Sequence, residues 1–111
     1  MPTEVIIRVF AHDHDLRGWL VDELALMSPT IEVQTTAILD AGAAQLLIVG
    51  LDALLPAELA TLGALLERRG VPVIGIGTAP PLATAFVCVL DAKLTSKQLK
   101  RAVRDALAAP Q

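Results

Sequence analysis

The sequence is short of cysteine, of positive charge and of long apolar runs. Its single cysteine, Cys88, excludes an internal disulfide and fits a reducing cytosol. The longest apolar stretches, such as 46–51 and 83–90, are far shorter than the roughly 20 residues that a membrane-spanning helix needs. Because Glu4 lies near the amino terminus and no basic region precedes a cleavage site, we expect no secretory signal and a cytoplasmic location.

The formal net charge of −3 gives no electrostatic footprint for nucleic acid, so protein or small-ligand partners are favoured. Hydrophobic residues make up 54% of the 111 positions and charged residues 19%. This composition supplies enough apolar surface for one core without disulfides or a bound metal. We therefore expect a single globular domain over residues 1–111.

Hydrophobic patterning alternates between the strand and the helix periods. Apolar or alternating runs indicate strands at 5–10, 31–34, 45–50, 71–76 and 85–90. Three–four spacing predicts helices over 16–27, between Pro56 and Gly70, and after the capping-box pattern Thr95–Gln98. Two further segments are less regular: 37–44 has room for a helix of about two turns, and two adjacent prolines favour a loop at 78–84.

Strands that alternate with helices through short connections require right-handed crossovers, and hence a parallel sheet. The predicted fold is α/β and flavodoxin-like. In such sheets ligands lie outside the carboxyl ends of the strands. Those ends present four short segments: Ala11–Asp15, Gly50–Asp52, Gly77–Thr78 and Asp91–Lys93.

The segment Leu46–Pro56 resembles the third strand and following turn of response-regulator receiver domains, in which an aspartate ends the strand and a proline follows four positions later. Asp52 and Pro56 match that spacing. The rest of the chain is similar in order, with Leu16-Arg17 after an acidic loop, Pro72-Val73-Ile74 in a strand and Lys93-Leu94-Thr95 before the last helix.

The resemblance implies a doubly wound, five-stranded parallel sheet of order 2-1-3-4-5, and it marks Asp52 as the candidate phosphoacceptor. Compared with a complete receiver, we expect a reduced second helix and a missing or vestigial fourth helix.

Receivers place two consecutive acids after the first strand to hold Mg²⁺, which prefers oxygen ligands. Here that place falls on Ala11 and His12, or, after a shift of one residue, on the candidate acidic-loop residues His12 and Asp13. Imidazole is a poor ligand for Mg²⁺. His14 and Asp15 follow, but alternating residues of one loop seldom converge on a metal, so we expect no metal site.

The family's hydroxyl residue and lysine, which contact the phosphoryl oxygens in receivers, do not align cleanly with this sequence either. Thr78 is a candidate phosphate-contact residue, and Gly77 aligns with the family's hydroxyl position equally well. The family's lysine falls on Ala92, which leaves Lys93, the second candidate contact, one position late and on the other side of an extended backbone. We expect no cofactor, and Mg²⁺ only if Asp52 accepts a phosphoryl group; otherwise Asp52 is a turn or capping residue.

In the family's strand order, the second and fourth helices cover the same face of the sheet. Polar residues stand at alternate positions of the first two strands, where a covered strand should be apolar: Arg8, Glu32 and Gln34. We therefore predict that this face is either solvated near the second strand or covered by a partner, with these three residues as a candidate interaction face.

The last predicted helix is basic, through Lys97, Lys100, Arg101 and Arg104. Such a face is usually solvated, and docking of an acidic partner is the alternative.

These features favour a degenerate receiver, or pseudo-receiver, that takes part in two-component signalling by protein contact and is not an enzyme. Such modules also occur inside hybrid sensor histidine kinases, so the chain could be a piece of a longer signalling protein. The expected partners are a histidine kinase, a phosphotransfer domain, another receiver or a second copy, with neither nucleic acid nor membrane insertion. Two alternatives stay open, a phosphoryl-accepting switch that uses Asp52 and a small-ligand-binding α/β domain.

Overall fold

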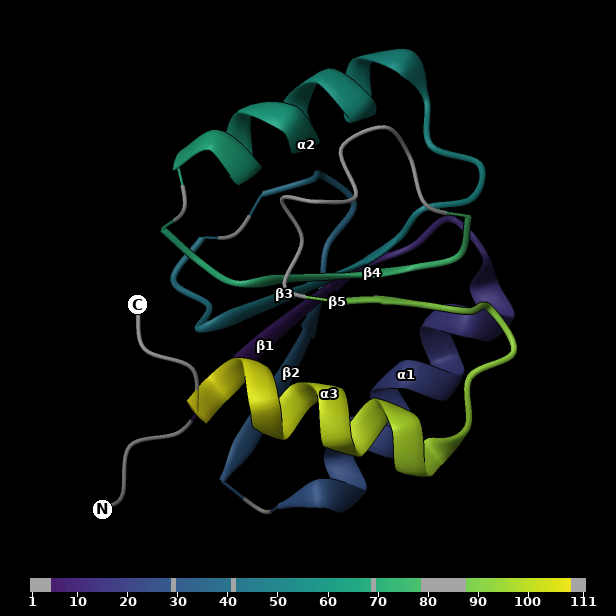
Figure 1. Ribbon diagram of the computed structural model, residues 1–111, viewed down its shortest axis with the longest axis vertical. Coiled ribbons are helices and arrows are strands. Elements are labelled where there is room, and N and C mark those ends of the chain that lie inside the picture. The colour runs from purple at the N-terminus through teal and green to yellow at the C-terminus, as the bar shows by residue number, and fades with distance from the viewer. Residues whose placement is uncertain (1–4, 29, 41, 69, 79–87, 109–111) are drawn as a thin grey trace.

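The computed structural model describes residues 5–28, 30–40, 42–68, 70–78 and 88–108. Five strands and three helices lie within these ranges (Figure 1). In chain order they are β1 (Val5–Phe10), α1 (His14–Met27), β2 (Ile31–Thr35), β3 (Leu46–Gly50), α2 (Pro56–Arg68), β4 (Val73–Ile76), β5 (Cys88–Leu90) and α3 (Ser96–Ala108). None of the helices in these ranges has the length and apolar character that crossing a membrane requires.

The strands form one sheet in the order β2-β1-β3-β4-β5, and every neighbouring pair is parallel. This confirms the predicted order and fold class. Helices α1 and α3 cover one face of the sheet and α2 covers the other (Figure 1). Because all the strands run in one direction, their carboxyl ends gather along one side of the molecule, on the right in Figure 1.

Two hydrophobic cores lie on the two faces, and β1 contributes to both. Ile7 and Val9 belong to the core under α1 and α3, whereas Phe10 belongs to the core under α2. The alternation follows from the two-residue period of a strand. Trp19 and Cys88 are partly buried against the first core, so packing accounts for both.

The helix starts are fixed by local hydrogen bonds. Asp13 caps α1, because its Oδ1 accepts the backbone N–H groups of Asp15 and Leu16 at 2.9 and 3.1 Å. The predicted capping box of α3 is confirmed: Gln98 Oε1 accepts the N–H of Thr95 at 2.8 Å, and Thr95 Oγ1 accepts the N–H of Gln98 at 3.2 Å.

The short helix predicted over 37–44 is wrong, because none of the residues described in that segment is helical. Side chains satisfy the backbone in its place. Thr36 Oγ1 donates to the carbonyl of Ile38 at 2.7 Å and accepts its N–H at 3.2 Å, while Asp40 Oδ1 accepts the N–H of Gly42 at 3.2 Å. Gly42 has φ +55°, which ends any helical course. The segment still covers part of the sheet, because Leu39 is buried in the core under α2.

Element ends differ from the prediction by a few residues: α1 begins earlier, at His14, and β4 begins later, at Val73. The predicted loop over 78–84, and with it the absence of a fourth helix, falls largely outside the described residues, as do positions 85–87 of the last predicted strand.

Candidate functional site

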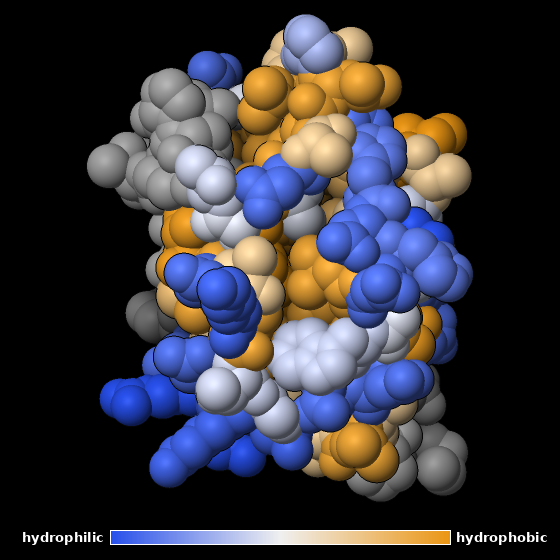
Figure 2. All heavy atoms as spheres, turned by 90° about the vertical axis from the view of Figure 1, so that its right-hand side faces the viewer, coloured by the Kyte–Doolittle hydropathy of each residue, from blue (hydrophilic) through white to orange (hydrophobic). Residues whose placement is uncertain are grey.

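The carboxyl ends of the strands enclose a small cavity of about 80 Å³ at the end of the molecule that Figure 2 faces. Its described lining comes from the ends of β1, β3 and β4, the start of α1 and the turn after β5: Ala11, His12, Asp13, Leu16, Gly50, Asp52, Ile76 and Ala92. Only three of these side chains carry a titratable group, and two of the three are carboxylates. This cavity is where receiver chemistry would be expected.

Asp52 follows β3, is exposed to solvent and lines the cavity. Its Oδ1 accepts the backbone N–H of Thr78 at 3.1 Å, because β3 and β4 pair in parallel and end side by side. The carboxylate lies against Gly77, where a Cβ would come within 2.8 Å of Asp52 Oδ2. The structure therefore brings Asp52 and Thr78 together, through the backbone of Thr78.

His12 extends from the end of β1 across to the first turn of α2. Its Nε2 lies 2.7 Å from Glu58 Oε1, and its ring meets the buried ring of Phe10 edge to face at 5.2 Å. Glu58 Oε1 also accepts the N–H of Leu55 at 2.8 Å. The Leu55 N–H first, and His12 second, lower the pKa of Glu58. Glu58 was not among the predicted site residues, and its only signal in the sequence is its place in the first turn of the helix.

Lys93 is exposed and its backbone N–H donates to Asp91 Oδ1 at 2.8 Å. The cavity is lined by Ala92 and, among the described residues, not by Lys93. At this point the described lining of the cavity therefore offers a methyl group and no cation.

The residues present do not fit Mg²⁺. The ion demands an octahedral shell of oxygen ligands and is held in proteins by carboxylates. Within the described residues no group of three His, Cys, Asp or Glu side chains is placed to hold a metal. Of the two carboxylates at the cavity, Asp13 already caps α1 with Oδ1 and Asp52 already binds Thr78 with Oδ1.

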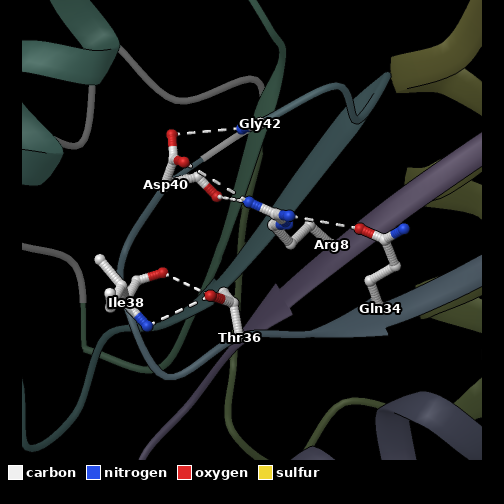
Figure 3. A network of polar contacts seen from close by, with 6 residues as sticks. All are labelled: Arg8, Gln34, Thr36, Ile38, Asp40 and Gly42. Carbon is white, nitrogen blue, oxygen red and sulfur yellow. Dashed lines mark hydrogen bonds and ion pairs between the residues drawn. The ribbon is translucent and has the colours of Figure 1, made fainter.

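The predicted interaction face lies on the α2 side of the sheet, beside β2. Arg8 and Gln34 are register partners on β1 and β2, so their side chains point to the same face (Figure 3). Arg8 Nη2 donates to Gln34 Oε1 at 3.4 Å, and Gln34 Nε2 donates to Glu32 Oε2 at 2.6 Å. The structure therefore joins all three predicted residues in one network.

Two residues that the sequence did not single out complete this network. Arg8 Nη1 donates to the carbonyl of Asp40 at 3.1 Å and lies 3.6 Å from Asp40 Oδ2 (Figure 3). The guanidinium lies so close to Gly42 that a Cβ there would come within 2.6 Å of Nη1. Arg8 Nε is buried without a partner among the described groups. The loop after β2 thus engages Nη1 of Arg8, while Nη2 binds Gln34 on β2.

No protein-family model matches the chain, and a search of curated proteins finds no relative. Solved structures do match. A response regulator receiver domain protein from Clostridium thermocellum aligns with TM-score 0.70 and 14% identity over 93% of this chain and 94% of that one. The response regulator ChrA of a heme-sensing two-component system aligns with TM-score 0.69 and 15% identity, over 98% of this chain and 62% of that one. The signal receiver domain of NarL from Mycobacterium tuberculosis aligns with TM-score 0.66 and 16% identity over 98% of this chain and all of that one.

The chain has the receiver fold. At these identities the likeness establishes the architecture, and function must be argued from the residues of the site. Asp52, the candidate phosphoacceptor of the sequence analysis, follows β3 at the carboxyl end of this sheet and lines the cavity there.

Proposed function

We propose that the chain is a degenerate receiver of two-component signalling, which acts by protein contact and not by phosphoryl transfer. The receiver structures that it resembles come from response regulators, one of them part of a heme-sensing two-component system. The observation that carries the proposal is that the two candidate acidic-loop residues are already engaged, His12 with Glu58 and Asp13 with the start of α1.

Phosphoryl transfer to an aspartate brings two anionic groups together, so catalysis depends on cations placed around the transferred group. Two groups that could supply positive charge are missing from the cavity. No donor set for Mg²⁺ is present among the described residues, and Ala92 stands where a lysine would be needed. Among the described groups, the hydrogen bond to the Asp52 carboxylate comes from the N–H of Thr78, a neutral donor.

A module of this kind works by occupying or releasing a partner. The partners that suit it are a histidine kinase, a phosphotransfer domain or a second receiver, and the place of action is the cytoplasm. Exposed apolar side chains are available for such contacts, since Leu55 is 59% and Ile38 is 74% exposed. Figure 2 shows apolar surface gathered at the top of the carboxyl-end side, over the first turns of α2.

The test is labelling of the purified chain with acetyl phosphate and Mg²⁺, read by intact mass. We expect no phosphorylated species, in parallel with a response regulator that has a complete site as positive control. Labelling that disappears in Asp52→Ala would overturn the proposal and establish the second candidate, a phosphoryl-accepting switch, which the Asp52–Thr78 contact at 3.1 Å favours.

The small-ligand alternative has a cavity to rest on at the α2 side of the sheet, beside Asp40 and Gly42. It measures about 220 Å³ and is lined by Asp40, Gly42, Leu47, Leu65, Arg68, Gly70, Val71 and Val73. Ligand sites usually measure about 300–1,000 Å³. The cavity is therefore small for a metabolite, which is why contact with a protein is the function that we propose.

A further inference from the structure

The outward surface of α3 is a stripe of positive charge. At the helical period its basic residues fall on the face opposite the buried one, which is formed by Leu99, Ala102, Val103 and Ala106. We call these residues the α3 stripe: Lys97, Lys100, Arg101 and Arg104. The stripe runs for about 10 Å along the helix axis.

The charges of the α3 stripe are placed unfavourably with respect to one another and to the helix dipole. Its members are spaced three or four residues apart, so each neighbouring pair repels. Lys97 lies in the first turn, where the helix dipole disfavours a cation, and the last turn has no basic residue. Charges arranged against the local rules, without a structural compensation, are typical of functional surfaces.

The stripe is also unpaired within the described part of the chain, where the two ion pairs are Arg8–Asp40 and His12–Glu58. An open groove of about 620 Å³ runs along it, lined by the four basic side chains with Ser96 and Asp105. The surface is therefore ready to receive negative groups along its length.

We propose that the α3 stripe docks an acidic helix of a partner protein, with Asp or Glu residues at the same three–four spacing. This deepens the proposed function, on which it rests, by naming a surface and a kind of partner. Since the whole chain carries −3 and α3 carries +3, the remainder carries −6. A nucleic acid or an anionic membrane would extend past the stripe and be repelled by the negative charge of the rest of the chain. A short acidic helix would contact the stripe alone.

The experiment titrates the isotope-labelled chain with a synthetic alanine-based helical peptide that carries four Glu residues at this spacing. At about 20 mM salt, where screening is weak, we expect amide shifts confined to α3 and its neighbours, and binding that weakens steadily as salt is added. Arg101→Glu should weaken binding about fivefold or more, because the reversal removes an attraction of up to about 1 kcal/mol and adds a repulsion of similar size.

Arg68→Glu is the matched control, since it reverses an exposed arginine on α2, on the other face of the sheet. It should change the affinity less than about twofold. A peptide in which one Glu is replaced by Lys should recover affinity for Arg101→Glu. Circular dichroism of both variants shows that each is folded.

Three results would overturn the proposal: no shift in α3 at low salt, an equal loss of affinity in the Arg68→Glu control, or binding of duplex DNA or anionic vesicles as tight as that of the peptide. The labelling experiment on Asp52 is independent of this titration. Labelling of Asp52 would contradict the proposed degenerate-receiver function. A failed titration without labelling would contradict only the proposal that the α3 stripe docks an acidic helix.

Discussion

The carboxylate of Asp52 lies against the backbone of Gly77, so close that a Cβ at position 77 would come within 2.8 Å of Oδ2. Gly77 has φ +122°, a conformation that only glycine adopts readily. The pair fixes how the turn after β3 meets the end of β4. Position 77 therefore requires glycine for two reasons: its φ angle is positive, and the Asp52 carboxylate leaves no room for a Cβ.

We expect Gly77→Ala to lower the free energy of unfolding by more than about 1 kcal/mol, since alanine must strain the backbone and displace the carboxylate. Urea denaturation measures this loss. Gly18→Ala is the control: position 18 is inside α1 with no atom within 4 Å of an added Cβ, so the substitution should stabilise by about 0.5–1 kcal/mol. A Gly77→Ala protein as stable as the parent would contradict the geometry.

The Arg8 network gives a second prediction, in the form of a double-mutant cycle. Gly42→Ala should destabilise by more than about 1 kcal/mol, because φ is +55° and the new Cβ would meet the guanidinium of Arg8. Arg8→Met should cost less than about 1 kcal/mol, since a buried Nε without a partner is removed with the charge.

Combining the two changes removes the clash and leaves only the backbone strain. We therefore expect the double variant to be more stable than the sum of the single effects by at least about 0.5 kcal/mol. Simple additivity would show that Gly42 and Arg8 are not in contact. The same Arg8→Met protein tests the candidate interaction face, because loss of partner binding without loss of stability would assign Arg8 to a contact.

The third prediction concerns acid stability. The pKa of Glu58 is lowered below its ordinary value of 4.5 by the Leu55 N–H and by His12. A carboxylate with a depressed pKa stabilises the fold above its unfolded pKa, and this contribution is lost as the pH falls through the folded value. Between about pH 5 and pH 3 the free energy of unfolding should therefore fall less steeply in Glu58→Gln than in the parent. Parallel slopes would show that Glu58 does not titrate differently on folding.

The fourth prediction rebuilds the site. If the missing charges are what prevents phosphoryl transfer, Ala11→Asp, His12→Asp and Ala92→Lys together should produce labelling by acetyl phosphate in the presence of Mg²⁺. The same triple variant with Asp52→Ala is the control and should stay unlabelled. Failure of the rebuilt protein to label, while it remains folded, would mean that the defect lies elsewhere than in these three residues.

The sequence predicts features that depend on neighbouring residues. The capping box of Thr95 and Gln98 is local, and both of its hydrogen bonds form. The extended backbone expected at Ala92 and Lys93 is wrong: both residues lie in a turn after β5, where the N–H of Lys93 donates to Asp91 Oδ1. The sheet order came from the likeness of one strand and turn to receivers, and not from periodicity.

Contacts between residues that are far apart in the chain could not be predicted from the sequence. His12 and Glu58 are 46 positions apart, and no pattern in either segment predicts that the two side chains meet. The helix expected at 37–44 failed because Thr36 and Asp40 bond to the nearby backbone, which competes with helical hydrogen bonds. Helix propensity depends on residue type alone. The conformation of this segment depends instead on the hydrogen bonds that the side-chain oxygens of Thr36 and Asp40 form.

The two faces of the sheet are unequally supported, and this has a consequence for motion. Among residues 5–78 and 88–108, apart from the gaps at 29, 41 and 69, two helices pack on the core that contains Ile7, whereas one helix packs on the core that contains Phe10. Local opening costs least where fewest elements pack, so α2 should come away from the sheet at a lower free energy than α1 or α3. The contact between His12 and Glu58 joins these two halves across the strand ends. When α2 opens that contact breaks while the other half stays intact, so the carboxyl-end surface would exist in a closed and an open form.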